Sequence, residues 1–132
     1  MAAPAPQRPL SPHLQIWRWT PTMAASITHR ATGIALYSGT ILLAVWTSAL
    51  ALGAQAFQPV GALLSSPLGQ LALAGYGWAL IFHAFNGLRH LYWDQGNGLD
   101  VKSARATAIA AFAASLGLAA MLVAAGFMNR AG

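Results

Sequence analysis

Apolar residues dominate three long stretches of the chain, and each is long enough to cross a lipid bilayer as a helix. The first is free of charge from Gly33 to Leu52, and we expect the helix that enters it to start near Thr22. About 20 helical residues, at about 1.5 Å each, cross the roughly 30 Å hydrocarbon layer. In lipid a spanning segment must satisfy its own backbone hydrogen bonds, which favours helices. The pattern predicts an all-α membrane protein with three transmembrane helices, at about residues 24–52, 68–93 and 104–128.

Polar and Pro-rich segments separate these spans. Residues 1–21 predict a disordered tail followed by a segment that lies on the membrane surface, where tryptophans flank Arg18. The transmembrane domain then covers residues 22–132. Within it, Pro59 and Gly61 predict a loop over Ala54–Ser66, and residues 95–100 predict a tighter turn.

Composition supports a membrane protein and excludes several other classes. Hydrophobic residues make up 57% of the chain and charged residues only 7%, against roughly 25% charge in soluble domains. The net charge of +5 comes from seven basic residues without a cluster that could follow a phosphate backbone, so we expect no nucleic-acid partner. The absence of cysteine excludes disulfides, thiolate zinc sites and cysteine-ligated iron–sulfur clusters.

The basic residues predict the orientation in the membrane. Six of the seven lie before or at the start of the first span, or around the connection between the second and third: Arg8, Arg18, Arg30, Arg89, Lys102 and Arg105. Both regions belong to the same side. Because cytoplasmic segments carry the excess of Lys and Arg, we expect a cytoplasmic N-terminus and a C-terminus on the opposite side.

Small residues recur in the second and third spans. They allow close approach of another backbone or a flat cofactor, and we expect them to serve ordinary helix packing within this chain. The residues concerned are Gly69, Gly75, Gly77, Gly87, Ala113, Gly117 and Gly126.

His83 is the clearest chemical candidate, because a polar group at membrane depth is costly. His83, Gly87, His90 and Asp94 follow helical spacing and share one face. A neutral imidazole is a good haem-iron ligand, Gly87 leaves room for a porphyrin edge, and Arg89 with His90 forms a basic rim that could pair haem propionates. The alternative is a histidine that only hydrogen-bonds a neighbouring helix.

If His83 is an axial ligand, a six-coordinate iron needs a second one. The other histidines, His13, His29 and His90, are expected at or outside the cytoplasmic interface. None matches the depth of His83 on another helix, so we expect the second ligand from a different chain; a five-coordinate haem would not need it.

Ser26 and Arg30 form a second candidate site. They are four residues apart and therefore face the same way at the start of the first span. A hydroxyl and a guanidinium at the edge of the lipid could hold a quinone carbonyl and favour the negative charge of reduction. The alternative is an arginine that snorkels to the interface beside a helix-capping serine.

The acidic residues limit what the chain can do. Both of them, Asp94 and Asp100, are predicted on the cytoplasmic side, so no carboxylate relay crosses the membrane. This argues against a proton-coupled transporter.

Three motifs together resemble the cytochrome b membrane-anchor subunit of succinate dehydrogenase, respiratory complex II. They are RPLSPHL at Arg8–Leu14, SITHRATG at Ser26–Gly33 and HAFNGLRHLYWD at His83–Asp94, in the family's order and spacing. The first looks most like the alphaproteobacterial and mitochondrial branch. Thr28 departs from the family, where Leu is common, but Ser26 and Arg30 are in place.

The resemblance implies a role in passing electrons from succinate to ubiquinone. A flavoprotein subunit would oxidise succinate, an iron–sulfur subunit would relay the electrons, and a second anchor would pack against this chain in a bacterial inner membrane, with the C-terminus periplasmic. His83 would bind haem b with a histidine of the second anchor, Ser26 and Arg30 would line the quinone site, and His29 and His90 would lie near the haem propionates.

Alone, the chain is expected to be non-catalytic. A fumarate reductase anchor and a haem-free helical scaffold are the alternative functions.

Overall fold

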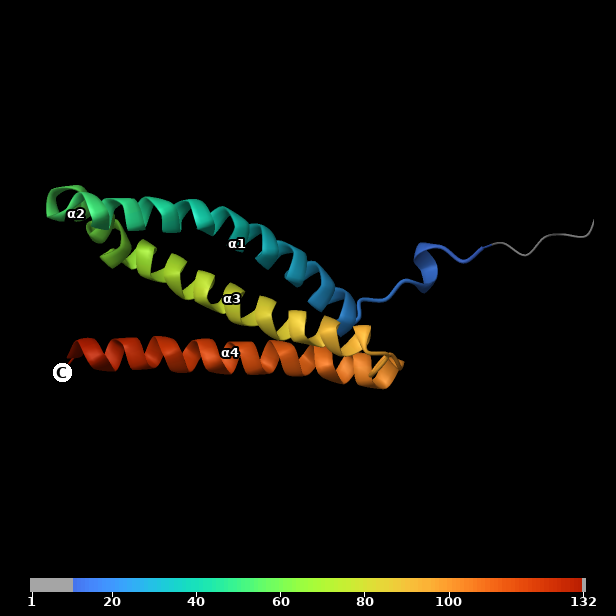
Figure 1. The fold of residues 1–132 in the computed structure, drawn as a ribbon. Helices are drawn as coiled ribbons and strands as arrows, with labels where there is room; N and C mark the ends of the chain where they lie inside the picture. The colour runs from blue at the N-terminus through green and yellow to red at the C-terminus, as the bar shows by residue number, and fades with distance from the viewer. Residues whose placement is uncertain (1–10, 132) are drawn as a thin grey trace, which may run out of the picture.

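The structure, a computed structural model, describes residues 11–131, and the side chains of residues 11–129. One short 3-10 helix, η1 (Leu14–Ile16), precedes four α-helices: α1 (Pro21–Leu52), α2 (Ala54–Ser65), α3 (Pro67–Asp94) and α4 (Val101–Ala131) (Figure 1). The predicted all-α fold is confirmed. Three of the helices, α1, α3 and α4, are long and apolar enough to cross a membrane. The first three residues of the motif Arg8–Leu14 lie outside the described residues, as does the tail predicted at the N-terminus.

Local sequence signals determine where the long helices begin. Thr20 caps α1 by accepting a hydrogen bond from the Met23 N–H at 3.3 Å, and Pro21 occupies the first turn. Ser66 and Pro67 repeat this arrangement at the start of α3. A capping hydroxyl followed by proline is a strong helix start, because proline has no N–H to leave unpaired.

The prediction of a loop over Ala54–Ser66 is wrong, because this segment forms α2. The chain reverses instead at the two residues that flank α2. Gly53 has φ +96°, a conformation that side chains disfavour, and Ser66 is extended. These two turns let Pro59 and Gly61 lie inside a short helix, where the Phe57 ring packs beside Gly61.

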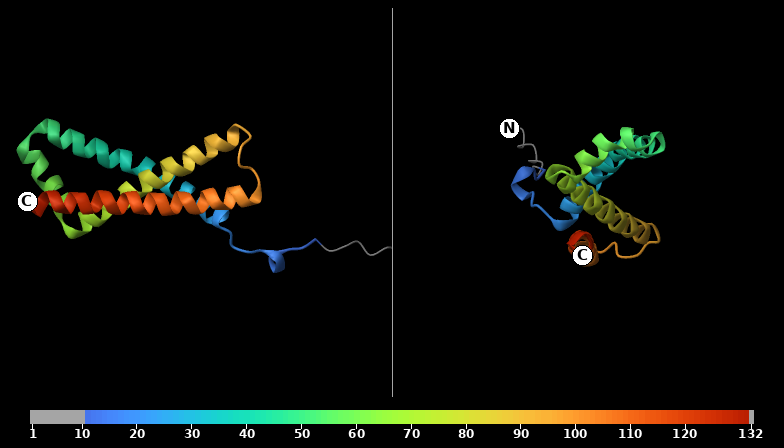
Figure 2. Two further views of the ribbon diagram at one scale, coloured as in Figure 1. Left: turned by 90° about the horizontal axis from the view of Figure 1, so that it is seen from below. Right: turned by 90° about the vertical axis from the view of Figure 1, so that its left-hand side faces the viewer.

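Helix α3 is the central element of the bundle. It packs against α1 on one side and α4 on the other, and α2 joins α1 to α3 at the far end (Figures 1 and 2). The core consists of small α1 and α4 residues around Phe82, which is fully buried. Phe82 and Phe112 have ring centroids 4.7 Å apart, so aromatic packing joins α3 to α4.

Most of the small residues predicted to pack within the chain do not. A Cβ built at Gly75, Gly77, Gly87, Gly117 or Gly126 meets nothing within 4 Å in the described part of the chain. By contrast, Gly39 faces the Tyr76 ring and Gly69 faces the backbone of α2. The expectation of packing within one chain is therefore wrong for these five glycines, and they leave open surface for lipid or another subunit.

Candidate functional site

Three histidines gather between α1 and α3. The rings of His29 on α1 and His83 on α3 are stacked, with centroids 3.9 Å apart and an interplanar angle of 16°. His90 lies 5.3 Å from His29 and meets Trp93 edge-on at 5.2 Å. Within the described residues, these side chains do not form a three-ligand site for a bare metal ion. The structure thus brings together all three histidines that the sequence singled out for haem.

The His83 ring packs against one face of α1. Nδ1 of His83 lies 3.2 Å from the Thr32 hydroxyl oxygen. Cε1 of His83 lies against Gly33, where an added Cβ would come within 3.1 Å of that carbon. The hydrogen bond to a neighbouring helix, which the sequence left as the alternative, is therefore present. It occupies one ring nitrogen only, and among the described residues no hydrogen bond reaches Nε2. Helix packing and iron ligation are compatible.

The prediction that no other histidine reaches the depth of His83 is wrong, because His29 stacks on it. Which residues of α1 lie level with His83 depends on how the antiparallel helices α1 and α3 align, and the sequence of either helix alone does not give that alignment. The rings of His29 and His83 touch face to face, so His29 would not serve as a second ligand beside His83 in this arrangement.

Arg89 does not belong to the basic rim predicted beside His90. It is 6% exposed and packs toward α4. Its guanidinium donates to the Thr107 hydroxyl at 3.0 Å, the Ala104 carbonyl at 3.0 Å and the Asn86 side-chain oxygen at 3.2 Å, and it lies over the Trp93 ring at 3.9 Å. Of the two predicted rim residues, His90 alone remains on the His83 face, where it is exposed.

The residues fit a haem in three respects. Nε2 of His83 accepts no hydrogen bond from a described residue. The Nδ1 atom of His29 is buried and lacks a partner in the same part of the chain. Space beside Gly87, one turn from His83, is open. A free ligand nitrogen, an unpaired polar atom and an open helix face are what a flat polar-edged cofactor requires.

Ser26 and Arg30 lie one turn apart on α1, flanking His29. Ser26 is half-buried and Arg30 is exposed. Ser26 is inside α1 rather than at its cap, which Thr20 provides, so the capping alternative is wrong. Neither side chain hydrogen-bonds another residue within the described chain, which leaves both free to bind a ligand.

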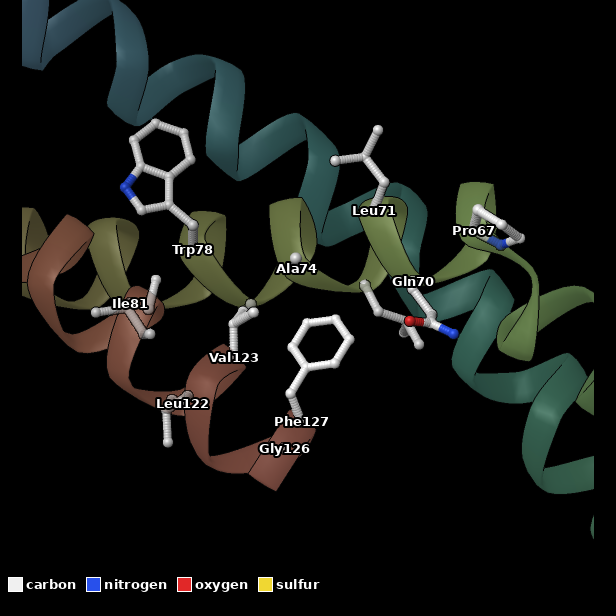
Figure 3. A pocket seen from close by; sticks show the side chains of 13 residues that line it. Pro67, Gln70, Leu71, Ala74, Trp78, Ile81, Leu122, Val123, Gly126 and Phe127 are labelled. Atoms are coloured by element: carbon white, nitrogen blue, oxygen red, sulfur yellow. The ribbon is translucent and has the colours of Figure 1, made fainter. Parts of the chain in front are cut away.

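Two hollows in the surface of the described residues have volumes of about 590 Å³ each. One is an apolar groove between α3 and α4 near Trp78 and Phe127, at the end away from the histidines, and it contains no ionisable group (Figure 3). The other lies at the histidine end, between the segment around Trp19 and the start of α4, and is lined by Arg18 and Arg105. Neither contains a predicted site residue.

Sequence reasoning missed Thr32, Asn86 and Thr107. The first two lie inside the motifs that carried the resemblance, so their positions were visible. Their roles depend on which helix faces which, and a single sequence does not give that.

Comparison with known proteins agrees with the motifs. Residues 4–122 match the family described as "Succinate dehydrogenase/Fumarate reductase transmembrane subunit". The chain is 40% identical over 114 residues to the succinate dehydrogenase cytochrome b556 subunit of Paracoccus denitrificans, covering 86% of this chain and 88% of the relative. It is 42% identical over 122 residues to the mitochondrial cytochrome b560 subunit of Sus scrofa, covering 86% and 71%. The cytochrome b556 subunit of Rickettsia felis is 33% identical over 101 residues, covering 76% and 78%.

Proposed function

This chain belongs to the succinate dehydrogenase/fumarate reductase transmembrane-subunit family, as a multi-pass membrane anchor, and we propose that it binds haem b through His83 and helps to form a ubiquinone-reduction site. The family description includes fumarate reductases. The named relatives are succinate dehydrogenase subunits, which favours electron flow from succinate to quinone.

The observation that carries the haem proposal is the environment of His83. The ring lies inside a membrane helix, one nitrogen is hydrogen-bonded to Thr32, and the other has no partner among the described residues. The relatives are named cytochromes b. Haem b supplies one-electron transfer when bound. His83 would ligate its iron, His29 and His90 would lie near its propionates, and a second anchor subunit would supply the other axial histidine.

Ser26 and Arg30 are proposed to bind the quinone. Both lie beside the histidine cluster, and neither side chain hydrogen-bonds a described residue. The Ser26 hydroxyl would orient a quinone carbonyl, and the Arg30 cation would stabilise the negative charge that develops on reduction.

The proposed partners are the second anchor, an iron–sulfur subunit and a flavoprotein subunit, in a bacterial inner membrane. The start of α1, the end of α3 and the start of α4 share one end of the bundle (Figure 1). The basic residues Arg18, Lys102 and Arg105 lie at that end, which supports a cytoplasmic N-terminus. Copurification of a flavoprotein and an iron–sulfur protein in equal amounts tests the assembly.

An absorption spectrum of the purified complex tests the haem ligand. His83→Ala should abolish the low-spin b-type spectrum, and His13→Ala, an exposed histidine before α1, should preserve it. An unchanged spectrum in His83→Ala would exclude the ligand assignment and favour the haem-free scaffold.

Two activities of the same complex test the quinone site. Arg30→Ala and Ser26→Ala should lower quinone reduction while succinate oxidation with a soluble dye survives. Arg105→Ala and Ser38→Ala, exposed residues of the same types, serve as controls. Equal loss of both activities would point instead to failed assembly.

A further inference from the structure

We propose that Thr32 is a positioning residue that fixes the tautomer of His83. Its hydroxyl oxygen accepts a hydrogen bond from the protonated Nδ1, which leaves Nε2 unprotonated and able to bind iron. The inference rests on the proposed role of His83 as haem ligand, and it concerns a residue that would act on the haem only through His83.

The direction of this hydrogen bond follows from the single hydroxyl proton of Thr32. The hydroxyl is 2.9 Å from the Thr28 carbonyl and 3.0 Å from the His29 carbonyl in the preceding turn. Both carbonyls can only accept, so the proton points back along α1. The lone pairs of the oxygen then face Nδ1 of His83 at 3.2 Å, and the imidazole must donate.

A second threonine in the molecule shows the same arrangement with an unambiguous donor. Thr107 on α4 bonds back to the Ser103 carbonyl at 2.9 Å and accepts from Nε of Arg89 at 3.0 Å. A guanidinium has no acceptor, so Thr107 must present a lone pair to α3. Thr32 and Thr107 therefore act alike on the two sides of α3, one toward an imidazole and one toward a guanidinium.

The ring has little freedom to leave this hydrogen bond. His29, Thr32 and Gly33 share one face of α1. The His29 ring covers one face of the imidazole, and Gly33 lies against Cε1. A donated hydrogen bond at the outer nitrogen fixes the tautomer and orientation of a ligating histidine and raises its basicity. A more basic ligand stabilises ferric over ferrous haem, so Thr32 should keep the haem potential low.

The test compares single variants of the assembled complex by redox titration and low-spin EPR. Thr32→Val keeps the side-chain shape and removes the acceptor. We expect the haem midpoint potential to rise, the low-spin signal to shift, and haem affinity to fall roughly 10–100-fold. Thr32→Ser should restore the parental values. Thr47→Val is the matched control, since Thr47 makes the same back-bonds, at 2.9 and 3.0 Å, on an exposed face of α1.

His83→Ala separates failure of this inference from failure of the haem proposal. If His83→Ala loses the low-spin signal while Thr32→Val keeps the parental potential and signal, the role of Thr32 is wrong and the ligand stands. If His83→Ala keeps the signal, both are wrong. If Thr32→Val fails to assemble, Thr32→Ser and Thr32→Ala are compared instead, because they differ by one hydroxyl. Equal midpoint potentials and low-spin signals in these two variants would overturn the role of Thr32.

Discussion

A guanidinium buried between two membrane helices needs hydrogen-bond acceptors, and Arg89 finds neutral ones. Its donors reach Asn86, Thr107 and the Ala104 carbonyl, and the Trp93 ring covers its plane. No carboxylate pairs with it in the described chain. Arg89 thus joins α3 to α4 on the side of α3 that faces away from His83.

We expect Thr107→Val to destabilise the complex by about 1.5–3 kcal/mol, the usual contribution of a hydrogen bond to a charged group. Thermal unfolding of the detergent-solubilised complex measures the change. Thr47→Val, which loses back-bonds but no guanidinium, should unfold near the parental temperature. Equal unfolding temperatures for Thr107→Val and the parent would show that Arg89 is satisfied without Thr107.

Helical spacing and the family motifs were enough to identify the candidate residues, but their contacts required the tertiary register. His29, His83 and His90 were singled out from the sequence and do come together. Arg89 was misplaced because one residue step rotates a side chain by about 100° around a helix. That rotation separates it from its neighbour His90 and turns it toward α4.

One crowded glycine and one open glycine allow a test of the contact between α1 and α3. A Cβ at Gly39 would overlap the ring of Tyr76, whose hydroxyl donates to the Leu36 carbonyl at 3.4 Å. Gly39→Ala should therefore destabilise the complex by about 1–3 kcal/mol through overpacking. Gly75→Ala, where nothing lies within 4 Å, should be neutral or stabilise by about 0.5–1 kcal/mol. Thermal unfolding of both variants checks this, and equal effects would contradict the α1–α3 contact.

The start of α4 depends on an exposed carboxylate. Ser103, through its side chain and its backbone N–H, holds the pKa of Asp100 below the ordinary value, and its N–H donates to the carboxylate at 2.9 Å. Because the pKa of Asp100 is lower in the folded chain than in the unfolded chain, where it is about 3.9, the ionised carboxylate stabilises the fold at pH values above about 3.9. This stabilisation is lost as the pH falls through the pKa of the folded chain.

Amide hydrogen exchange at Ser103, corrected for the intrinsic rate at each pH, tests this cap. Protection should hold from neutral pH to about pH 4 and fall below it. Asp100→Asn keeps an acceptor but cannot titrate, so protection of Ser103 in this variant should not fall below about pH 4. The same fall in both proteins would assign the effect to another group.

The sequence predicted the ends of the long helices better than the connection between α1 and α3. Apolar length alone gave the expected spans, and the structure adds the capping pairs Thr20–Pro21 and Ser66–Pro67, which need no tertiary context. Pro59 also looked like a local signal, for a loop, but it lies inside α2. Gly53 and Ser66 already provide the turns, so the segment between them is free to be helical.

At the scale of the molecule, little of the apolar surface is buried within the described chain. The core is confined to a few residues around Phe82, while large side chains such as Leu42 and Leu68 are 70% and 72% exposed. A soluble domain would not expose surface of this kind. Lipid and a second anchor are the proposed covering.

The orientation can be tested cleanly because the chain contains no cysteine. Gln58 on α2 and Asn97 between α3 and α4 are exposed, at opposite ends of the bundle (Figure 1). We expect a membrane-impermeant maleimide to label Gln58→Cys in intact spheroplasts, and to label Asn97→Cys only after the membrane is opened with a denaturing detergent. The denaturant exposes a thiol that a partner subunit covers. Since the basic residues favour the cytoplasm for the Asn97 end, the opposite pattern would invert the topology and put the proposed quinone site on the periplasmic side.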